Sequence, residues 1–263
     1  MARYVFVGGL HRSGTSIVSR MIASLENVAS ISNAPVPENE GVYLQGAIPH
    51  TALHGRPMHF ATDPDQHHIE GGSFDRLDVR DRIASDWEKW FQPQDAPWRL
   101  EKSPVNFSRM RLYQQLFPLS QFIVVIRHPQ AVAGAVAKWV NLARDEALDH
   151  WIEAHGRMQG DAAHLHSVMI LRYEDVMERP RAHMEAFAAF LQLQPRYDFA
   201  LPSGHRNDAY PGWSVTPGRE AALADWGYGP GMGQQDYVPI VRHPLRAVRK
   251  GVSAALGRQT RES

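Results

Sequence analysis

The sequence predicts an α/β protein with a P-loop-like three-layer fold, in which a central, mainly parallel sheet carries helices on both faces. Short apolar runs typical of buried strands alternate along the chain with longer segments of helical period. The first run, residues 4–7, passes through Gly8 and Gly9 directly into a helical segment. Basic residues follow the ends of other runs, and parallel sheets bind their ligands at that edge.

Four segments are expected to be strands. Residues 121–126 (Gln-Phe-Ile-Val-Val-Ile) give the clearest signal, because Gln121 is followed by five apolar residues, all aromatic or β-branched, that run directly into Arg127. The first strand, over residues 4–7, is ended by two glycines, which interrupt regular structure. The other two expected strands cover residues 98–101 and 167–171.

Helices are predicted where apolar residues recur every three or four positions. In the first of them Ile17, Met21 and Leu25 share one face, and Pro129 suits the first turn of a later one. Gly156 and Gly160 weaken the signal over the longest segment. The expected helices cover residues 13–25, 75–91, 106–117, 129–141, 145–166, 181–193 and 245–256.

Two long segments lack a regular period. Residues 30–72 are rich in Pro, Gly, Asn and His, and residues 195–239 hold six Pro and seven Gly. Long irregular segments in a compact domain are usually functional, so residues 41–72 and 195–239 are expected to face a substrate. We expect one domain over residues 1–263.

Composition narrows the possible functions. The 263 residues include 43% hydrophobic residues. The 28 Lys and Arg balance the 28 Asp and Glu, so the chain has no excess of positive charge and no nucleic-acid partner is expected. Without any cysteine, neither a disulfide nor a thiol nucleophile can form. No stretch approaches 18 apolar residues, so we expect no membrane span and a cytoplasmic location. The oligomeric state is not predicted.

The loop after the first strand is a candidate phosphate site. Gly9 and Gly14, followed by Thr15 and Ser16, imitate the spacing of a nucleotide-binding P-loop at a helix N-terminus. Thr15 stands where the P-loop lysine would be, and Arg12 supplies the charge instead. The clearest strand ends in Arg127 rather than in the Asp that helps to hold Mg²⁺. The pattern favours a phosphate-bearing ligand held by arginine, with an atypical P-loop kinase as the alternative.

Residues 6–16 resemble the 5′-phosphosulfate loop of sulfotransferases that use 3′-phosphoadenosine 5′-phosphosulfate (PAPS), in the Arg-Ser-Gly-Thr form of bacterial and Golgi-type members. Three further segments match in the expected order. They are the lysine-bearing residues 101–106 (Glu-Lys-Ser-Pro-Val-Asn), the strand, loop and helix over 124–132, and residues 171–176 (Leu-Arg-Tyr-Glu-Asp-Val).

The resemblance, over residues 4–193, implies transfer of a sulfuryl group from PAPS to a hydroxyl or amine. The acceptor would be a saccharide, a lipid-linked sugar or a small molecule, 3′,5′-ADP would be released, and no metal would be required. A non-catalytic nucleotide-binding protein with the same fold remains an alternative.

The resemblance also implies two clamps for the nucleotide. Arg12, with the N–H groups of Ser13, Gly14, Thr15 and Ser16, would hold the 5′-phosphosulfate end. Arg127 would hold the 3′-phosphate, because a guanidinium matches phosphate oxygens with two hydrogen bonds.

For three further positions in the binding of the nucleotide, the resemblance leaves the role of the residue open. Ala135 stands where the family often has a serine that binds the same phosphate. Tyr173 would pack against the adenine or in the core. Arg249, Lys250 and Gly251 are similar to a 3′-phosphate segment of cytosolic members, or form a basic turn on a surface helix.

Catalysis needs cations at the leaving oxygen and a base for the acceptor's proton. Lys102 and Arg12 are the candidate cations. Glu40 is the favoured base and Glu38 the second choice, since the family uses either such a Glu or a His near the lysine, and no His lies between Lys102 and Arg127.

Five histidines fall in the first irregular segment, and their spacing fits no metal-ligand pattern, so no metal site is expected. They are His50, His54, His59, His67 and His68.

Overall fold

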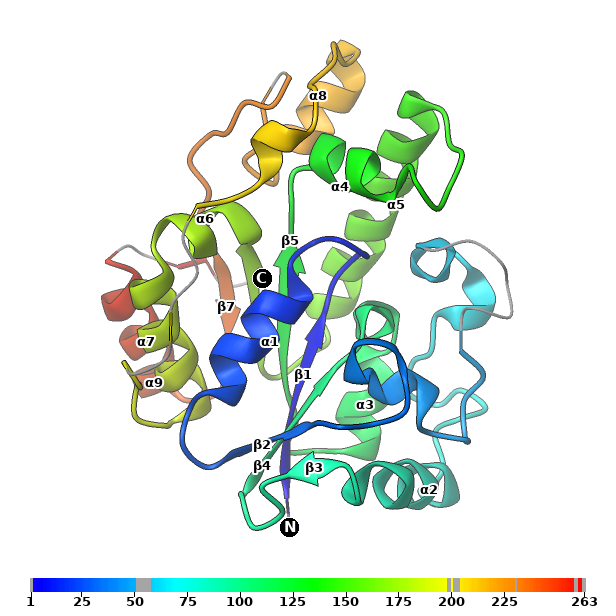
Figure 1. The fold of residues 1–263 in the computed structure, drawn as a ribbon, viewed down its shortest axis with the longest axis vertical. Coiled ribbons are helices and arrows are strands. Elements are labelled where there is room, and N and C mark those ends of the chain that lie inside the picture. Colours follow the sequence, from blue (N-terminus) through cyan, green and yellow to red (C-terminus); the bar gives the residue numbers. More distant parts are fainter. Residues whose placement is uncertain are drawn as a thin grey trace.

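The computed structural model describes residues 2–50, 58–197, 200, 204–229, 231–257 and 260–261. Within them one sheet of seven strands has the order β3-β2-β4-β1-β5-β6-β7 (Figure 1). The five inner strands are parallel, whereas β3 and β7 are antiparallel at the two edges. The strands are β1 (Arg3–Gly8), β2 (Val28–Ile31), β3 (Phe91–Gln92), β4 (Trp98–Lys102), β5 (Gln121–Ile126), β6 (Val168–Arg172) and β7 (Ile240–Arg242).

Helices cover both faces of this sheet, which confirms the predicted three-layer α/β class (Figure 1). Helices α1, α7 and α9 pack on one face, and α2, α3 and α5 pack on the other. The α-helices are α1 (Thr15–Ala23), α2 (Leu77–Glu88), α3 (Met110–Leu116), α4 (Pro129–Val136), α5 (Arg144–Ala162), α6 (Tyr173–Glu178), α7 (Pro180–Leu191), α8 (Pro217–Ala224) and α9 (Arg246–Leu256).

The central strand β1 shows why both faces are covered. Its side chains alternate, so Tyr4 and Phe6 enter the core beneath α2 and α3, while Val5 and Val7 enter the core beneath α1 and α7. All four are buried. A strand that is apolar on both sides is stable only between two layers of helices.

The structure departs from the predicted elements mainly at edges and ends. The edge strands β3 and β7 and the short β2 were not predicted, because strands of two to four residues give little periodic signal. The predicted helix over 106–117 begins as a 3₁₀-helix, η6 (Pro104–Ser108), before α3. The predicted irregular segment 195–239 contains α8.

None of the helices in the part of the chain that the structure describes combines the length and apolar character needed to cross a bilayer.

Candidate active site

The loop between β1 and α1 has the backbone shape that its glycine predicts. Arg12 and Gly14 are both left-handed, with φ of 69° and 99°. A Cβ on Gly14 would also lie 2.4 Å from Cδ2 of Tyr173. Only glycine avoids both the strain and the clash. The helix therefore begins at Thr15, two residues later than the sequence predicted, because the loop needs Ser13 and Gly14 for its turn.

This loop offers several unpaired donors. None of the hydrogen bonds formed within the described residues uses the N–H groups of Gly14, Thr15 or Ser16. The buried Oγ atom of Ser13 has no partner there either. Buried or helix-terminal donors are normally satisfied by protein, water or a ligand. The loop therefore presents unpaired donors of the kind that bind the oxygens of an anion.

Arg127 lies against this loop at the carboxyl end of β5. Its Nη1 atom donates to the carbonyl oxygen of Arg12 at 2.8 Å, and its Nε atom donates to Oδ1 of Asn207 at 2.9 Å. Its guanidinium lies 4.5 Å above the ring of Tyr173. The third nitrogen, Nη2, donates to no group within the described residues. The structure thus brings the two arginines together, but it leaves Arg127 one nitrogen for a ligand rather than two.

Arg12 itself is exposed, and its guanidinium lies 5.5 Å from the ring of Trp139. Its neighbour in the loop, His11, is held differently. The Nδ1 atom of His11 accepts the N–H of Met58 at 3.2 Å, and burial lowers the pKa of His11 to about 4. The imidazole is therefore neutral near pH 7, with its proton on Nε2. Sequence reasoning gave this residue no role, because a histidine beside a glycine-rich loop has no distinguishing pattern.

Lys102 and Glu40 form a buried pair on the other side of the loop. The Lys102 Nζ atom lies 2.9 Å from Glu40 Oε1, and each residue is 7% exposed. Burial raises the pKa of the Glu40 carboxyl, an effect that the charge of Lys102 partly opposes. A carboxyl that is both partly desolvated and held by a lysine is suited to general base catalysis.

Glu38 has different surroundings. Its side chain is exposed, and one oxygen lies 3.4 Å from the hydroxyl of Ser16 at the start of α1. The structure therefore brings both predicted acids to the same edge of the sheet, with only Glu40 buried against Lys102.

A buried carboxylate positions this pair. Glu101, which is fully buried, accepts hydrogen bonds from the Gly41 N–H at 2.9 Å, from the Ser103 hydroxyl at 2.5 Å and from the Asn106 amide at 2.5 Å. The indole of Trp87 donates to the Gly41 carbonyl at 2.8 Å. These bonds fix the backbone that follows Glu40. An acid inside an apolar strand, directly before Lys102, was the available signal in the sequence.

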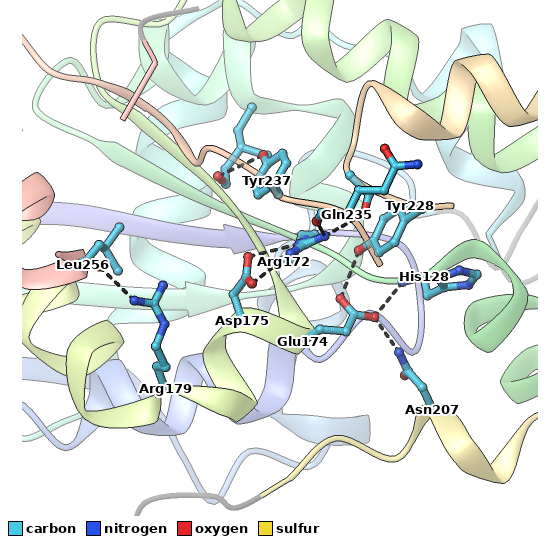
Figure 2. Close-up of polar contacts among 12 residues, drawn as sticks. His128, Arg172, Glu174, Asp175, Arg179, Asn207, Tyr228, Gln235, Tyr237 and Leu256 are labelled. Carbon is cyan, nitrogen blue, oxygen red and sulfur yellow. Dashed lines mark hydrogen bonds and ion pairs between the residues drawn. The ribbon is translucent and has the colours of Figure 1, made fainter. Parts of the chain in front are cut away.

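A second buried carboxylate ties the late irregular segment to the sheet (Figure 2). Glu174 accepts the N–H of His128 at 2.9 Å, the amide of Asn207 at 2.7 Å and the hydroxyl of Tyr228 at 3.0 Å. Because Asn207 also accepts from Arg127, one chain of hydrogen bonds runs from α6 to the loop between β1 and α1. Sequence reasoning missed Asn207, since nothing in its local sequence shows what it contacts.

Three predicted nucleotide contacts lie elsewhere. Arg249 donates to the carbonyl of His243, whose ring contacts Gln121. Gln121 begins β5, whereas Arg127 follows the end of that strand, so this arginine lies at the opposite end of the sheet, on the order of 15–20 Å away. Lys250 and Gly251 follow it on α9. For this tripeptide the structure therefore favours a basic turn on a surface helix over a 3′-phosphate contact.

Ala135, which stands where the family often has a serine, is buried on a helix that packs against Tyr210. Ala135 is buried on α4, and a Cβ on the preceding residue, Gly134, would lie 2.7 Å from Cδ1 of Tyr210. The guanidinium of Arg127 lies 5.7 Å from the Tyr210 ring. Tyr210 thus packs against Gly134, the residue before Ala135, and lies near Arg127.

The histidines of the first irregular segment do not gather. The ring of His67 contacts Asp161 at 2.7 Å, that of His59 lies 3.9 Å from Asp63, and those of His50 and His68 contact aromatic rings. His54 lies outside the described residues. In the described ranges, no three His, Cys, Asp or Glu side chains are grouped as metal ligands would be.

Comparison with known proteins defines the class. The model of the sulfotransferase family matches residues 4–198, so the chain belongs to that family. No curated protein gave a match.

Among solved structures, a sulfotransferase from Alicyclobacillus acidocaldarius is 13% identical with a TM-score of 0.46, covering 97% of this chain and 96% of its own. A sulfotransferase from Mycobacterium tuberculosis H37Rv is 14% identical with a TM-score of 0.45, covering 74% of this chain and 68% of its own. The sulfotransferase domain of the Synechococcus PCC 7002 olefin synthase is 15% identical with a TM-score of 0.47, covering 73% and 74%.

Proposed function

We propose that this protein transfers a sulfuryl group from PAPS to a hydroxyl or amine of an acceptor and releases 3′,5′-ADP. One observation carries the proposal. A loop with unpaired N–H groups lies beside a buried lysine–glutamate pair, at the carboxyl edge of a parallel sheet. Sulfuryl transfer needs an anion site and, next to it, a base with a cation.

The phosphate loop would hold the 5′-phosphosulfate end. The N–H groups of Gly14, Thr15 and Ser16 and the hydroxyl of Ser13 are donors without protein partners in the described residues. The helix that begins at Thr15 adds the positive end of its dipole. The exposed Arg12 adds a full positive charge, which stabilises the phosphate as the leaving group gains negative charge.

Arg127 would serve the 3′-phosphate with its Nη2 atom while Nε and Nη1 keep their present bonds. Its role is then double, because the same side chain fixes the Arg12 carbonyl in the loop. The ring of Tyr173 packs against both Gly14 and Arg127 and so holds the loop and the arginine in this arrangement.

Glu40 would accept the proton of the acceptor while the acceptor's oxygen or nitrogen bonds to sulfur and the bond from sulfur to the 5′-phosphate oxygen breaks. Lys102 has three N–H donors, of which one goes to Glu40. The other two can stabilise the charge that develops on the transferred group and on the leaving oxygen. No step in this scheme calls for a metal ion.

Binding and transfer measurements together test the proposal. In calorimetric titrations, 3′,5′-ADP should bind without magnesium and more tightly than ATP with Mg²⁺. Protein incubated with PAPS labelled with ³⁵S should move the label to an acceptor. Tighter binding of ATP with Mg²⁺ would instead support an atypical kinase, and binding of 3′,5′-ADP with no transfer to a broad acceptor panel would support a non-catalytic protein.

A further inference from the structure

A cavity of about 450 Å³ opens between α1 and the carboxyl ends of β2 and β4. Lys102 and the loop residue Ser16 both line it, so the cavity adjoins the pair that the proposed reaction uses. Its walls come from α1, β2, β4 and residues 32–39, rather than mainly from the irregular segments 41–72 and 195–239 that the sequence suggested. Its volume lies in the range of about 300–1,000 Å³ that is usual for small-molecule sites.

Most of the residues that line the cavity carry hydrogen-bonding groups. Four serines, one asparagine and three charged side chains line the cavity, with only Ala23, Ile31 and Leu100 as apolar neighbours. None of the lining residues within the described ranges is aromatic. Sites for planar aromatic ligands normally present apolar and aromatic surface, so this lining disfavours a phenolic acceptor.

Several of these groups are free to bind a ligand. Within the described residues, the hydroxyls of Ser19, Ser30 and Ser32 make no hydrogen bond, and Arg20 makes no ion pair. The exposed Glu38, which also lines the cavity, supplies a carboxylate acceptor. The cavity therefore presents both donors and acceptors. A ligand with several hydroxyl groups can pair with both sets, whereas a ligand with one hydroxyl would leave most of them unpaired.

We infer that this cavity binds the acceptor and that the acceptor is a non-aromatic, polyhydroxylated molecule such as a sugar or a cyclic polyol. The inference rests on the proposed sulfuryl transfer, because it takes Lys102 and Glu40 as the reacting pair. Arg20 and Ser30 then set the specificity for the acceptor without taking part in the chemistry.

Ligand-observed NMR on the full chain, saturated with 3′,5′-ADP, tests the inference with three probes: methyl β-glucopyranoside, myo-inositol and 2-naphthol. At least one polyol should bind, and more tightly than 2-naphthol does. Binding of 2-naphthol alone, or of none of the probes, would overturn the inference. A separate titration of 3′,5′-ADP shows whether the nucleotide site works, so its failure counts against the proposed function and not against the cavity.

Two variants locate the binding. Arg20→Met and Ser30→Ala should each weaken polyol binding by about 2- to 10-fold, as expected for a lost hydrogen bond, and leave 3′,5′-ADP affinity unchanged. The matched controls are Arg181→Met on α7 and Ser85→Ala on α2, both exposed and away from the cavity. Polyol binding that is equal in the cavity variants and their controls would place the acceptor elsewhere and refute the inference.

Discussion

Replacement of Glu40 by glutamine is the most direct test of the proposed chemistry. The change removes the carboxylate but keeps an oxygen that can still accept from Lys102, whose Nζ atom lies 2.9 Å away. Loss of a general base lowers kcat by about 10²–10⁴-fold, which corresponds to about 3–5 kcal/mol of transition-state stabilisation. Binding of 3′,5′-ADP should stay within about twofold, because Glu40 contacts Lys102 and not the phosphate loop.

The same substitution also lowers the free energy of unfolding, independently of its effect on kcat. It leaves the buried Lys102 charge with a neutral partner, and loss of a charged hydrogen bond costs about 1.5–3 kcal/mol. In a chain of this size each kcal/mol lowers Tm by about 2–4 °C. Thermal unfolding of the variant shows whether it is folded at the assay temperature. A folded variant that still binds 3′,5′-ADP has lost its activity through the chemistry and not through loss of structure.

The assay is transfer of ³⁵S from PAPS at saturating donor, with Glu38→Gln as the matched control. Glu38 is exposed and lines the proposed acceptor cavity, so at saturating acceptor this variant should keep kcat within about threefold and raise only the KM for the acceptor. If Glu40→Gln retains more than a tenth of wild-type kcat, Glu40 is not the base. An inactive Glu38→Gln beside an active Glu40→Gln would exchange their roles, and full activity in both would place the base elsewhere.

Further predictions concern the loop, the second arginine and the pH dependence. Gly14→Ala should weaken 3′,5′-ADP binding at least tenfold, since its Cβ would strike the Tyr173 ring; calorimetry with an unchanged Kd would contradict the steric argument. Arg127→Lys should weaken 3′,5′-ADP binding more than about tenfold, because one ammonium cannot reproduce the guanidinium's separate bonds to Asn207 and Arg12; wild-type affinity would show that the fork is unnecessary. Because burial raises the pKa of Glu40 and only its ionised form accepts a proton, kcat/KM should rise with pH through an apparent pKa above 4.5, and a limb below that value would refute this assignment.

The sequence alone was sufficient for the parts of this protein that depend on local pattern. The strand over residues 121–126 was predicted with the observed bounds, because five consecutive apolar residues after Gln121 are typical of a strand in a sheet interior. The loop between Gly9 and Gly14 was also predicted, since its glycines encode a backbone shape directly. Arg127 was expected at the ligand edge because it follows a parallel strand, and it lies there.

Tertiary structure decided which side chains meet. Glu38 and Glu40 lie two residues apart in similar sequence, yet only Glu40 is buried against Lys102, because Glu101 and Trp87 fix the turn at Gly41. These partners are 46–60 residues distant in the chain.

The Arg249 tripeptide, for which the sequence left two interpretations open, shows the converse. Its letters match a nucleotide-binding segment, but the antiparallel direction of β7 starts α9 at the opposite end of the sheet. Local periodicity determines strands, helices and glycine turns, whereas the partners of a buried charge depend on how distant segments pack. The local pattern of a single sequence does not specify which distant segments pack together.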